Sequence, residues 1–313
     1  MLMIPDYFHY LLTGRMAAEY SNATTTQLVN ADTGDWDSDL IDRLGYKRTL
    51  FQKIRQPGTV LGELNEKTAK EVGFSCWVVL PATHDTGSAV AAVPAQKEPF
   101  VYISSGTWSL MGTELSKPDC SEESRLHNFT NEGGYEHRYR YLKNIMGLWM
   151  IQSVKKELAP EMSYEEICRE AAGSRIGSIV DCNDERFLAP ESMTEEVQQA
   201  CRETKQQVPQ GIGQVAAVIY QSLARCYAGT IDELQKQTGC VYEQIHVVGG
   251  GANAEYLNEL TALETHKTVV AGPVEATAAG NVVIQLLAAG KWKNLTEART
   301  CIAESFPIRK YTD

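Results

Sequence analysis

The stretch IHVVGGGANAEYLNELTALETHKTVVAG, residues 245–272, reads as a strand, a glycine turn, a helix and a second strand. Residues 274–290 predict a further helix, and residues 211–238 predict one long helix upstream. The predicted strands are continuous apolar runs, as is typical of strands that are covered on both faces. Strands and helices that alternate in this way predict an α/β fold, in which helices pack on a largely parallel sheet.

Nearer the N-terminus, two β-rich runs flank Ser104–Thr107 and predict a strand, a tight polar turn and a second strand. Residues 142–158 predict an amphipathic helix. The polar segment 94–99 contains two prolines and separates two strand-rich parts of the chain. Because domain boundaries fall in polar, proline-bearing linkers, we expect two domains, residues 1–96 and residues 97–313.

The bulk composition is ordinary for a globular protein of two domains: 313 residues, of which 43% are hydrophobic and 22% charged. The formal net charge of -11 repels phosphate backbones, so we expect no nucleic-acid partner. No stretch approaches the ~18 apolar residues of a membrane span, and the N-terminus lacks the basic region of a signal peptide. These features predict a soluble, cytoplasmic protein without a membrane partner.

The cysteines and histidines give no sign of a metal site or a disulfide framework. The eight cysteines form no CxxC pair and have no zinc-finger spacing. Reduced thiols are therefore the prediction for a chain of this length. The histidines also lack metal-ligand spacing, which disfavours a metal-dependent hydrolase.

Asp85 stands in the stretch LPATHDTGSAVAAV, residues 80–93, between an apolar run and a row of small residues. A buried strand is expected to end at Pro81 and a helix to begin after Thr86, which places the carboxylate where ligands gather in open α/β sheets. The helix end favours an ionised carboxylate, which could accept a proton from a substrate hydroxyl. Capping of the helix is the competing role, and it is the stronger interpretation of these residues taken alone.

Three further segments combine glycine with polar side chains: residues 104–109, 128–134 and 249–253. The first, SSGTWS, suits a phosphate held by N–H groups and hydroxyls, but it lacks the spacing and the lysine of a Walker A loop. The second, NFTNEGG, suits a polyol or phosphate together with the donors that follow it, Arg138, Arg140, Lys143 and Asn144. The third, GGGAN, lets a ligand approach the start of a helix closely. A hairpin turn, a solvated loop and a tight strand-to-helix turn are the respective alternatives.

A dinucleotide oxidoreductase built on the glycine turn is disfavoured, because no acidic ribose-binding residue follows at the expected distance. The order of the motifs instead resembles the actin-like (ribonuclease H-like), two-domain sugar kinases of the FGGY carbohydrate kinase family. The similar segments cover nearly the whole chain and are DYFHYLLTG, NATTTQL, LPATHDTGSAV, YISSGTWSLMG, NFTNEGG, LKNIMGLWMIQ, VVGGGANAEYLN and AGPVEATAAGN. Within the family, the series is most similar to the branch that acts on L-rhamnulose.

The resemblance implies a reaction and a role for individual residues. The reaction is ATP-dependent phosphorylation of L-rhamnulose to L-rhamnulose 1-phosphate in L-rhamnose catabolism, with Mg²⁺. Asp85 would be the general base that takes the proton from the sugar hydroxyl. The implied sugar contacts are His84, Asp85, Thr86 and Asn144, and the implied ATP contacts are Thr107, Gln152 and Gly250.

The chain departs from the family pattern at its start, where family members carry a strand and a DxGxxS/T-type phosphate loop. We therefore expect residues 1–96 to form an incomplete first domain, and residues 97–313 a complete second domain. On that expectation the 313-residue chain is a truncated form that phosphorylates its sugar poorly or not at all. The alternative function is a non-catalytic remnant of a sugar kinase that still binds sugar or nucleotide.

Overall fold

The computed structural model describes every residue of the chain, from Met1 to Asp313. The chain folds into two compact units, and each unit is assembled from separate parts of the sequence. Unit 1 consists of Met1–Gln96, Thr113–Leu142 and Glu275–Ser305. Unit 2 consists of Lys97–Gly112, Lys143–Val274 and Phe306–Asp313. Whether residues 1–96 and 97–313 fold as separate domains stays a prediction.

One seven-stranded sheet has the strand order β11-β10-β9-β5-β6-β8-β7. Its strands are β5 (Val101–Ser105), β6 (Trp108–Leu115), β7 (Thr130–Gly133), β8 (Tyr139–Met146), β9 (Gln244–Val248), β10 (Thr268–Ala271) and β11 (Arg309–Tyr311). In unit 2, β9 pairs in parallel with both β5 and β10. These parallel strands bury side chains such as Ile103, Ile245 and Val269 completely. The α/β packing expected from the apolar runs is therefore confirmed.

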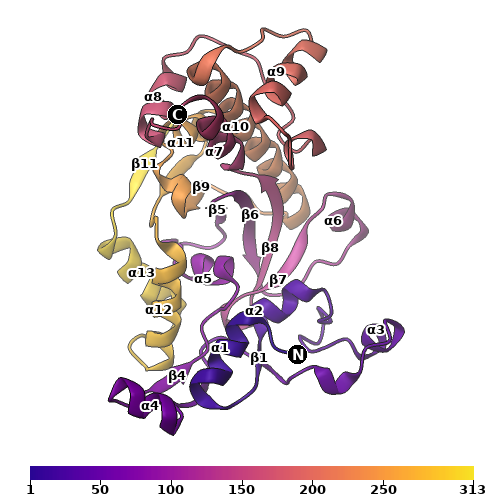
Figure 1. Cartoon of the computed structure of the whole chain (residues 1–313), viewed down its shortest axis with the longest axis vertical. Helices are drawn as coiled ribbons and strands as arrows, with labels where there is room; N and C mark the ends of the chain where they lie inside the picture. Colours follow the sequence, from indigo (N-terminus) through magenta and orange to yellow (C-terminus); the bar gives the residue numbers. More distant parts are fainter. The chain divides into compact units, whose positions relative to one another are not determined.

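The helices of unit 2 include α10, which runs through Gly211–Thr238 and is the longest helix of the chain (Figure 1). The others are α7 (Trp149–Leu158), α8 (Tyr164–Ala172), α9 (Met193–Glu203) and α11 (Glu255–Thr265), with 3₁₀ turns η4 (Glu185–Phe187) and η5 (Gly250–Asn253). α10 packs against α7, α8 and α11 and ends at Gly239, which takes a left-handed conformation with φ 67°. The long helix predicted over residues 211–238 is confirmed.

The amphipathic helix predicted over residues 142–158 is wrong in its first part. Residues up to Met146 belong to β8, and the helix begins only at Trp149. Gly147 joins the two, and a Cβ atom on it would lie 2.5 Å from the Trp108 carbonyl carbon. Pairing of β8 with its neighbours in the sheet thus overrides the helical pattern of the local sequence.

Unit 1 contains short helices, two small sheets and the helix pair α5–α12 (Figure 1). Its helices are α1 (Ile4–Thr13), α2 (Tyr20–Ala23), α3 (Ser38–Arg43), α4 (Glu66–Val72), α5 (Asp85–Ala91), α6 (Glu122–Leu126), α12 (Ala276–Ala288) and α13 (Leu295–Ser305), with 3₁₀ turns η1 (Thr24–Thr26), η2 (Arg48–Leu50) and η3 (Tyr135–His137). β1 (Ala18–Glu19) and β2 (Ile54–Arg55) pair in parallel, and β3 (Val60–Glu63) and β4 (Trp77–Val79) are antiparallel.

The strand expected before Pro81 is present as β4, but it is buried only in part: Val78 is buried, as is Leu80 directly after the strand, whereas its start is exposed. β4 has three residues and pairs only with β3. Its first residue, Trp77, is 64% exposed. Because a two-stranded sheet leaves part of its surface uncovered, an apolar run does not guarantee burial here.

The small residues after Asp85 are explained by close helix packing. Every residue of α5 after Asp85 is buried, and α12 packs directly on this helix. The closest approach is at Gly280, where a Cβ atom would lie 1.7 Å from the Ser88 carbonyl oxygen. Arg299, which is 2% exposed, donates a 2.9 Å hydrogen bond to the Val90 carbonyl near the end of α5. The helix that begins at Asp85 is thereby held rigidly along its length.

Asp6 is a buried carboxyl whose replacement is expected to change the pH dependence of folding. It is 2% exposed, and its Oδ1 accepts a 3.1 Å hydrogen bond from the Glu19 backbone N–H. Burial, aided by the negative charge of Glu19, raises the pKa of Asp6 from 3.8 to about 6. Since the folded state holds the proton more tightly, this stabilisation is complete below pH 3.8 and is lost as the pH rises through 6.

We therefore expect Asp6→Asn to stabilise the protein at pH 7.5 by ~1–3 kcal/mol, because one pKa unit is worth about 1.4 kcal/mol. Urea unfolding at several pH values measures the effect, which should shrink as the pH falls toward 4. Asp32→Asn, at an exposed carboxylate in the same unit, is the matched control and should change little. A gain that stays constant from pH 4 to pH 7.5 would contradict the role of the Asp6 proton.

Candidate active site

Asp85 is the first residue of α5, and its side chain is 78% exposed. One carboxylate oxygen, Oδ1, accepts a 2.6 Å hydrogen bond from the Thr86 N–H, and the Thr86 hydroxyl lies 3.3 Å from the same oxygen. The N-cap residue is His84, whose side chain makes no capping hydrogen bond. Asp85 is therefore not the N-cap, and its second oxygen is open to solvent.

His84 and Thr86 flank this carboxylate in different ways. Thr86 is 5% exposed, so its side chain contacts the Asp85 carboxylate from the buried side. The His84 ring is 25% exposed, and its Nε2 atom lies 3.7 Å from Asp85 Oδ1. The structure thus brings together three of the residues that the sequence analysis assigned to the sugar, on one short segment of unit 1.

Behind His84 lies a buried ion pair that the sequence analysis missed. Arg140 is fully buried, and its Nη1 lies 3.0 Å from Glu132 Oε2. The same guanidinium donates to the Gly133 carbonyl at 3.0 Å, and its Nη2 lies 3.0 Å from His84 Nδ1. Glu132 and Arg140 are direct partners in the register of β7 and β8. Arg140 therefore binds groups of the protein itself. The sequence around it had suggested an external polyol or phosphate ligand instead.

This arrangement controls the charges around the histidine. Burial of the Glu132 carboxyl raises its pKa, but the hydrogen bond with His84 and the charge of Arg140 lower it by more. The pKa of Glu132 therefore lies below its usual value, and the carboxylate is ionised. His84 Nδ1 lies 3.0 Å from Arg140 Nη2 and 3.3 Å from Glu132 Oε2, so it accepts from the guanidinium in one tautomer and donates to the carboxylate in the other. The other ring nitrogen, Nε2, is the one nearer Asp85.

In unit 2, the turn between β5 and β6 holds the start of α7. The carbonyls of Gly106 and Thr107 accept hydrogen bonds of 3.0 Å and 3.1 Å from the N–H groups of Leu148 and Trp149. These N–H groups have no partner within the helix, so the turn satisfies them. Thr107 itself is exposed. The SSGTWS turn is thus a hairpin turn that also anchors a helix.

The three glycines after β9 differ in backbone conformation and in the space around a Cβ atom. Gly249 has φ +83°, and a Cβ atom on it would lie 2.9 Å from the Ser105 carbonyl oxygen. A Cβ atom on Gly251 would lie 2.0 Å from Ser105 Oγ. Both glycines therefore allow the turn to pack on the end of β5. Gly250 has open space around it and faces outward, which leaves it as the glycine that a ligand could contact.

Gly250 and Gln152 line one cavity of about 340 Å³. This volume is within the range of roughly 300–1,000 Å³ that is usual for small-molecule sites. The residues that complete its wall are Leu148, Ile151, Tyr164, Cys168, Tyr220, Asn253 and Ala254. Apolar and aromatic groups with a few amides suit a flat, partly polar ligand. The structure thus brings together two of the three predicted ATP contacts, and the third, Thr107, accepts at the start of the same helix α7.

Asn144 is not among the residues that line this cavity. It lies on β8 in unit 2, and its side chain is exposed. No three His, Cys, Asp or Glu side chains lie together in a way that could hold a metal ion. None of the helices is both long and apolar enough to cross a membrane.

Comparison with solved structures shows the fold. Over 99% of this chain and 63% of the other, the structure matches the ligand-bound xylulose kinase from Lactobacillus acidophilus with a TM-score of 0.75 and 16% identity. It matches Plasmodium falciparum glycerol kinase with ADP over 99% of this chain and 62% of that one, with a TM-score of 0.75 and 12% identity. The α/β sugar-kinase fold expected from the sequence is confirmed.

Sequence comparison finds longer and more similar relatives. The chain is 49% identical over 310 residues to a rhamnulokinase of Halalkalibacterium halodurans, which covers 99% of this chain and 66% of that relative. It is 42% identical over 314 residues to a rhamnulokinase of Bacillus subtilis, covering 100% of this chain and 65% of that protein. The chain thus spans slightly less than two thirds of the length of these curated relatives.

Two family models account for most of the chain. Residues 1–92 match the N-terminal domain of the FGGY family of carbohydrate kinases. Residues 101–289 match the C-terminal domain of the same family. Both models, the fold and the curated relatives agree, and the chain belongs to the FGGY family of carbohydrate kinases.

Proposed function

We propose that this protein transfers the γ-phosphoryl group of ATP to L-rhamnulose, which gives ADP and L-rhamnulose 1-phosphate in L-rhamnose catabolism. The observation that carries the proposal is the 49% identity with a curated rhamnulokinase over 99% of this chain. The geometry supports it in each unit separately. Unit 1 presents an exposed carboxylate, and unit 2 presents a cavity beside a glycine turn.

In unit 1, Asp85 acts as the general base in this proposal. Thr86 occupies one carboxylate oxygen, so the second oxygen takes the proton of the sugar hydroxyl as that hydroxyl attacks phosphorus. His84 contributes its Nε2 atom as a sugar contact, while its Nδ1 atom lies 3.0 Å from Arg140 Nη2. Asn144, an exposed amide, is proposed as a further sugar contact.

In unit 2, Gln152 and Gly250 are proposed to contact the adenosine end of ATP in the cavity that they share. Thr107 is proposed to contact its phosphates from the turn before β6. Catalysis then consists mainly of positioning and of charge stabilisation at the transferred phosphoryl group, since such transfer needs little covalent chemistry from the protein.

Mg²⁺ is the proposed metal cofactor, and it enters with the nucleotide. In phosphoryl-transfer enzymes this ion is held largely by substrate phosphates and water, together with one or two carboxylates. The isolated, exposed carboxylate of Asp85 is compatible with that mode of binding, whereas a dedicated protein cage is not formed. The bound ion would neutralise phosphate charge.

The test is transfer of label from [γ-³²P]ATP to L-rhamnulose, which detects slow turnover, alongside D-xylulose, L-ribulose and glycerol. We expect label in L-rhamnulose 1-phosphate, formed more efficiently than any other product. Calorimetric titration with ADP and with L-rhamnulose is run in parallel. Binding of both without label transfer would favour the non-catalytic alternative, and preferred transfer to another acceptor would overturn the substrate assignment.

Gly250→Val is expected to weaken ADP binding by about tenfold or more, because the branched side chain fills part of the cavity; tenfold corresponds to about 1.4 kcal/mol. Nothing but a carbonyl oxygen 4.0 Å away surrounds a Cβ atom at this position, so the fold should tolerate the change. Gly177→Val, at an exposed glycine outside the cavity, is the matched control. Equal ADP affinity of the two variants would remove Gly250 from the nucleotide site.

A further inference from the structure

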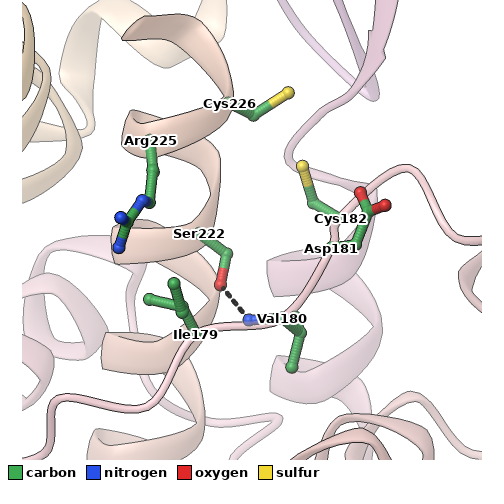
Figure 2. A pocket seen from close by; sticks show the side chains of 7 residues that line it. All are labelled: Ile179, Val180, Asp181, Cys182, Ser222, Arg225 and Cys226. Carbon is green, nitrogen blue, oxygen red and sulfur yellow. Dashed lines mark hydrogen bonds between the residues drawn. The ribbon is translucent and has the colours of Figure 1, made fainter. Parts of the chain in front are cut away.

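Two thiols meet at a second cavity of unit 2, separate from the one proposed for the nucleotide. This cavity has a volume of about 200 Å³ and lies between the segment 179–182 and α10. Cys182 and Cys226 both line it. Figure 2 shows their sulfur atoms turned toward one another, Cys182 from the segment and Cys226 from the helix. The proposed phosphoryl transfer gives neither residue a role.

The segment that carries Cys182 is fastened to α10. Ser222 Oγ accepts a 2.9 Å hydrogen bond from the Val180 N–H (Figure 2). It also donates a 2.6 Å hydrogen bond to the Val218 carbonyl. Cys182 is 1% exposed, whereas Cys226 is partly exposed. Both thiols line this one cavity, and each of them shifts the pKa of the other. The position of both thiols is therefore a feature of the packing, and its partial exposure makes Cys226 accessible to small molecules.

The surroundings make the two thiols chemically different. The hydrogen bond from the Cys182 thiol lowers the pKa of Cys226, although burial opposes this. The Asn183 amide, whose Nδ2 lies 3.2 Å from Cys226 Sγ, and the charge of Lys143 lower it further. The same contact and burial raise the pKa of Cys182. Cys226 is thus the nucleophile of the pair, since the thiolate is the reactive form, and Cys182 keeps its proton.

We propose that Cys182 and Cys226 form a site of reversible oxidation, which closes to a disulfide on reaction with a hydroperoxide or a small disulfide. With hydrogen peroxide, the Cys226 thiolate attacks one oxygen, the O–O bond breaks and hydroxide leaves, so Cys226 becomes a sulfenic acid. Cys182 then loses its proton and attacks the Cys226 sulfur, and the second hydroxide leaves. Two thiols and one peroxide give one disulfide and two waters, and the protein loses two electrons.

With a small disulfide as oxidant, Cys226 displaces one thiol to form a mixed disulfide, and Cys182 displaces the other. The remaining six cysteines lack such an arrangement. All eight are free thiols, and Cys76 and Cys120 are exposed. Exposure makes those two accessible, but Cys182 and Cys226 line one cavity together, so each has a second thiol beside it. An intramolecular disulfide at neutral pH is therefore expected here first.

The experiment treats the folded protein with hydrogen peroxide or, separately, with glutathione disulfide, blocks remaining thiols with N-ethylmaleimide and digests with trypsin. Cleavage after Arg175, Arg186, Arg225 and Lys236 places the two cysteines on separate peptides, residues 176–186 and 226–236. We expect a linked pair of these peptides under both oxidants. It should appear before any other linked pair and disappear on treatment with dithiothreitol.

Serine variants of the two cysteines test the role of each thiol separately. Cys182→Ser should abolish the linked pair and leave Cys226 trapped as a sulfenic acid that dimedone labels, whereas Cys226→Ser should leave Cys182 unlabelled. Cys201→Ser, at a buried cysteine away from the cavity, is the matched control and should leave the linked pair unchanged. The proposal is overturned if the linked pair forms only after unfolding in urea, or if dimedone labels Cys182 rather than Cys226. All of these readouts are independent of kinase activity.

Discussion

Asp85→Asn is expected to lower kcat for phosphorylation of L-rhamnulose by about 10²–10⁴-fold, the usual contribution of a general base. Asparagine has the same shape and can still accept the hydrogen bond from the Thr86 N–H, so the loop keeps its conformation. What is lost is the basicity of the second oxygen, which faces solvent. The label-transfer assay with saturating sugar and ATP measures the change against the unmodified protein.

Two controls separate loss of the base from damage to the fold. The side chain is 78% exposed, and surface substitutions usually change stability by less than about 0.5 kcal/mol, so the melting temperature should hardly move. The dissociation constant for L-rhamnulose should also change little. Glu123→Gln, at a carboxylate of 69% exposure in the same unit, should leave kcat unaltered. Near-normal kcat in Asp85→Asn would show that another group, or water, takes the proton.

The elements that were predicted well are those with local signals. The long helix over residues 211–238 and the helix over residues 274–290 have an apolar pattern and a glycine beyond their end, and both are present as α10 and α12. Residues 142–146 have a helical pattern too, but their hydrogen-bond partners are distant in the sequence. Because strand pairing is decided by such distant partners, it could not be predicted from this segment alone.

The composition of the two units also depends on distant contacts. The segment Glu275–Ser305 belongs to unit 1, although it comes shortly after β10 of unit 2 in the sequence. Close packing of α12 on α5 at Gly280 accounts for this. A single glycine in a run of small residues does not indicate which helix will pack against it. Each compact unit is therefore assembled from segments that are separated in the sequence.

In the candidate active site, the sequence predicts residues whose local pattern is typical of ligand sites. It does not predict residues whose role depends on partners that are distant in the sequence. An aspartate between a strand and a helix, and a glycine turn after a strand, are patterns tied to ligand sites. Glu132 and Arg140 were noticed only as part of a polar segment. Their roles follow from the register of β7 and β8, which places the two residues opposite each other. They also depend on the contact of Arg140 with His84, which is distant in the sequence.

Arg140→Met is expected to destabilise the protein by about 3–5 kcal/mol, because it leaves the Glu132 carboxylate buried without its cation. Methionine fills much of the same space, so loss of charge rather than a cavity dominates. The double variant Glu132→Gln/Arg140→Met removes both charges and should recover a large part of the loss. Equal destabilisation in the single and double variants, measured by urea unfolding, would mean that the buried charge is not the cause.

The pH dependence of stability gives a second, independent test of the Arg140→Met prediction. In the unmodified protein the pKa of Glu132 is lowered, so its contribution to stability is present above the ordinary carboxyl pKa and is lost as the pH falls through the lowered value. Without Arg140, burial becomes dominant and raises the pKa of Glu132, so the variant should instead gain stability as the pH falls. The stability difference between the two proteins should therefore narrow from pH 7 toward pH 4. A difference that widens in that range would exclude Glu132 as the group left without its partner.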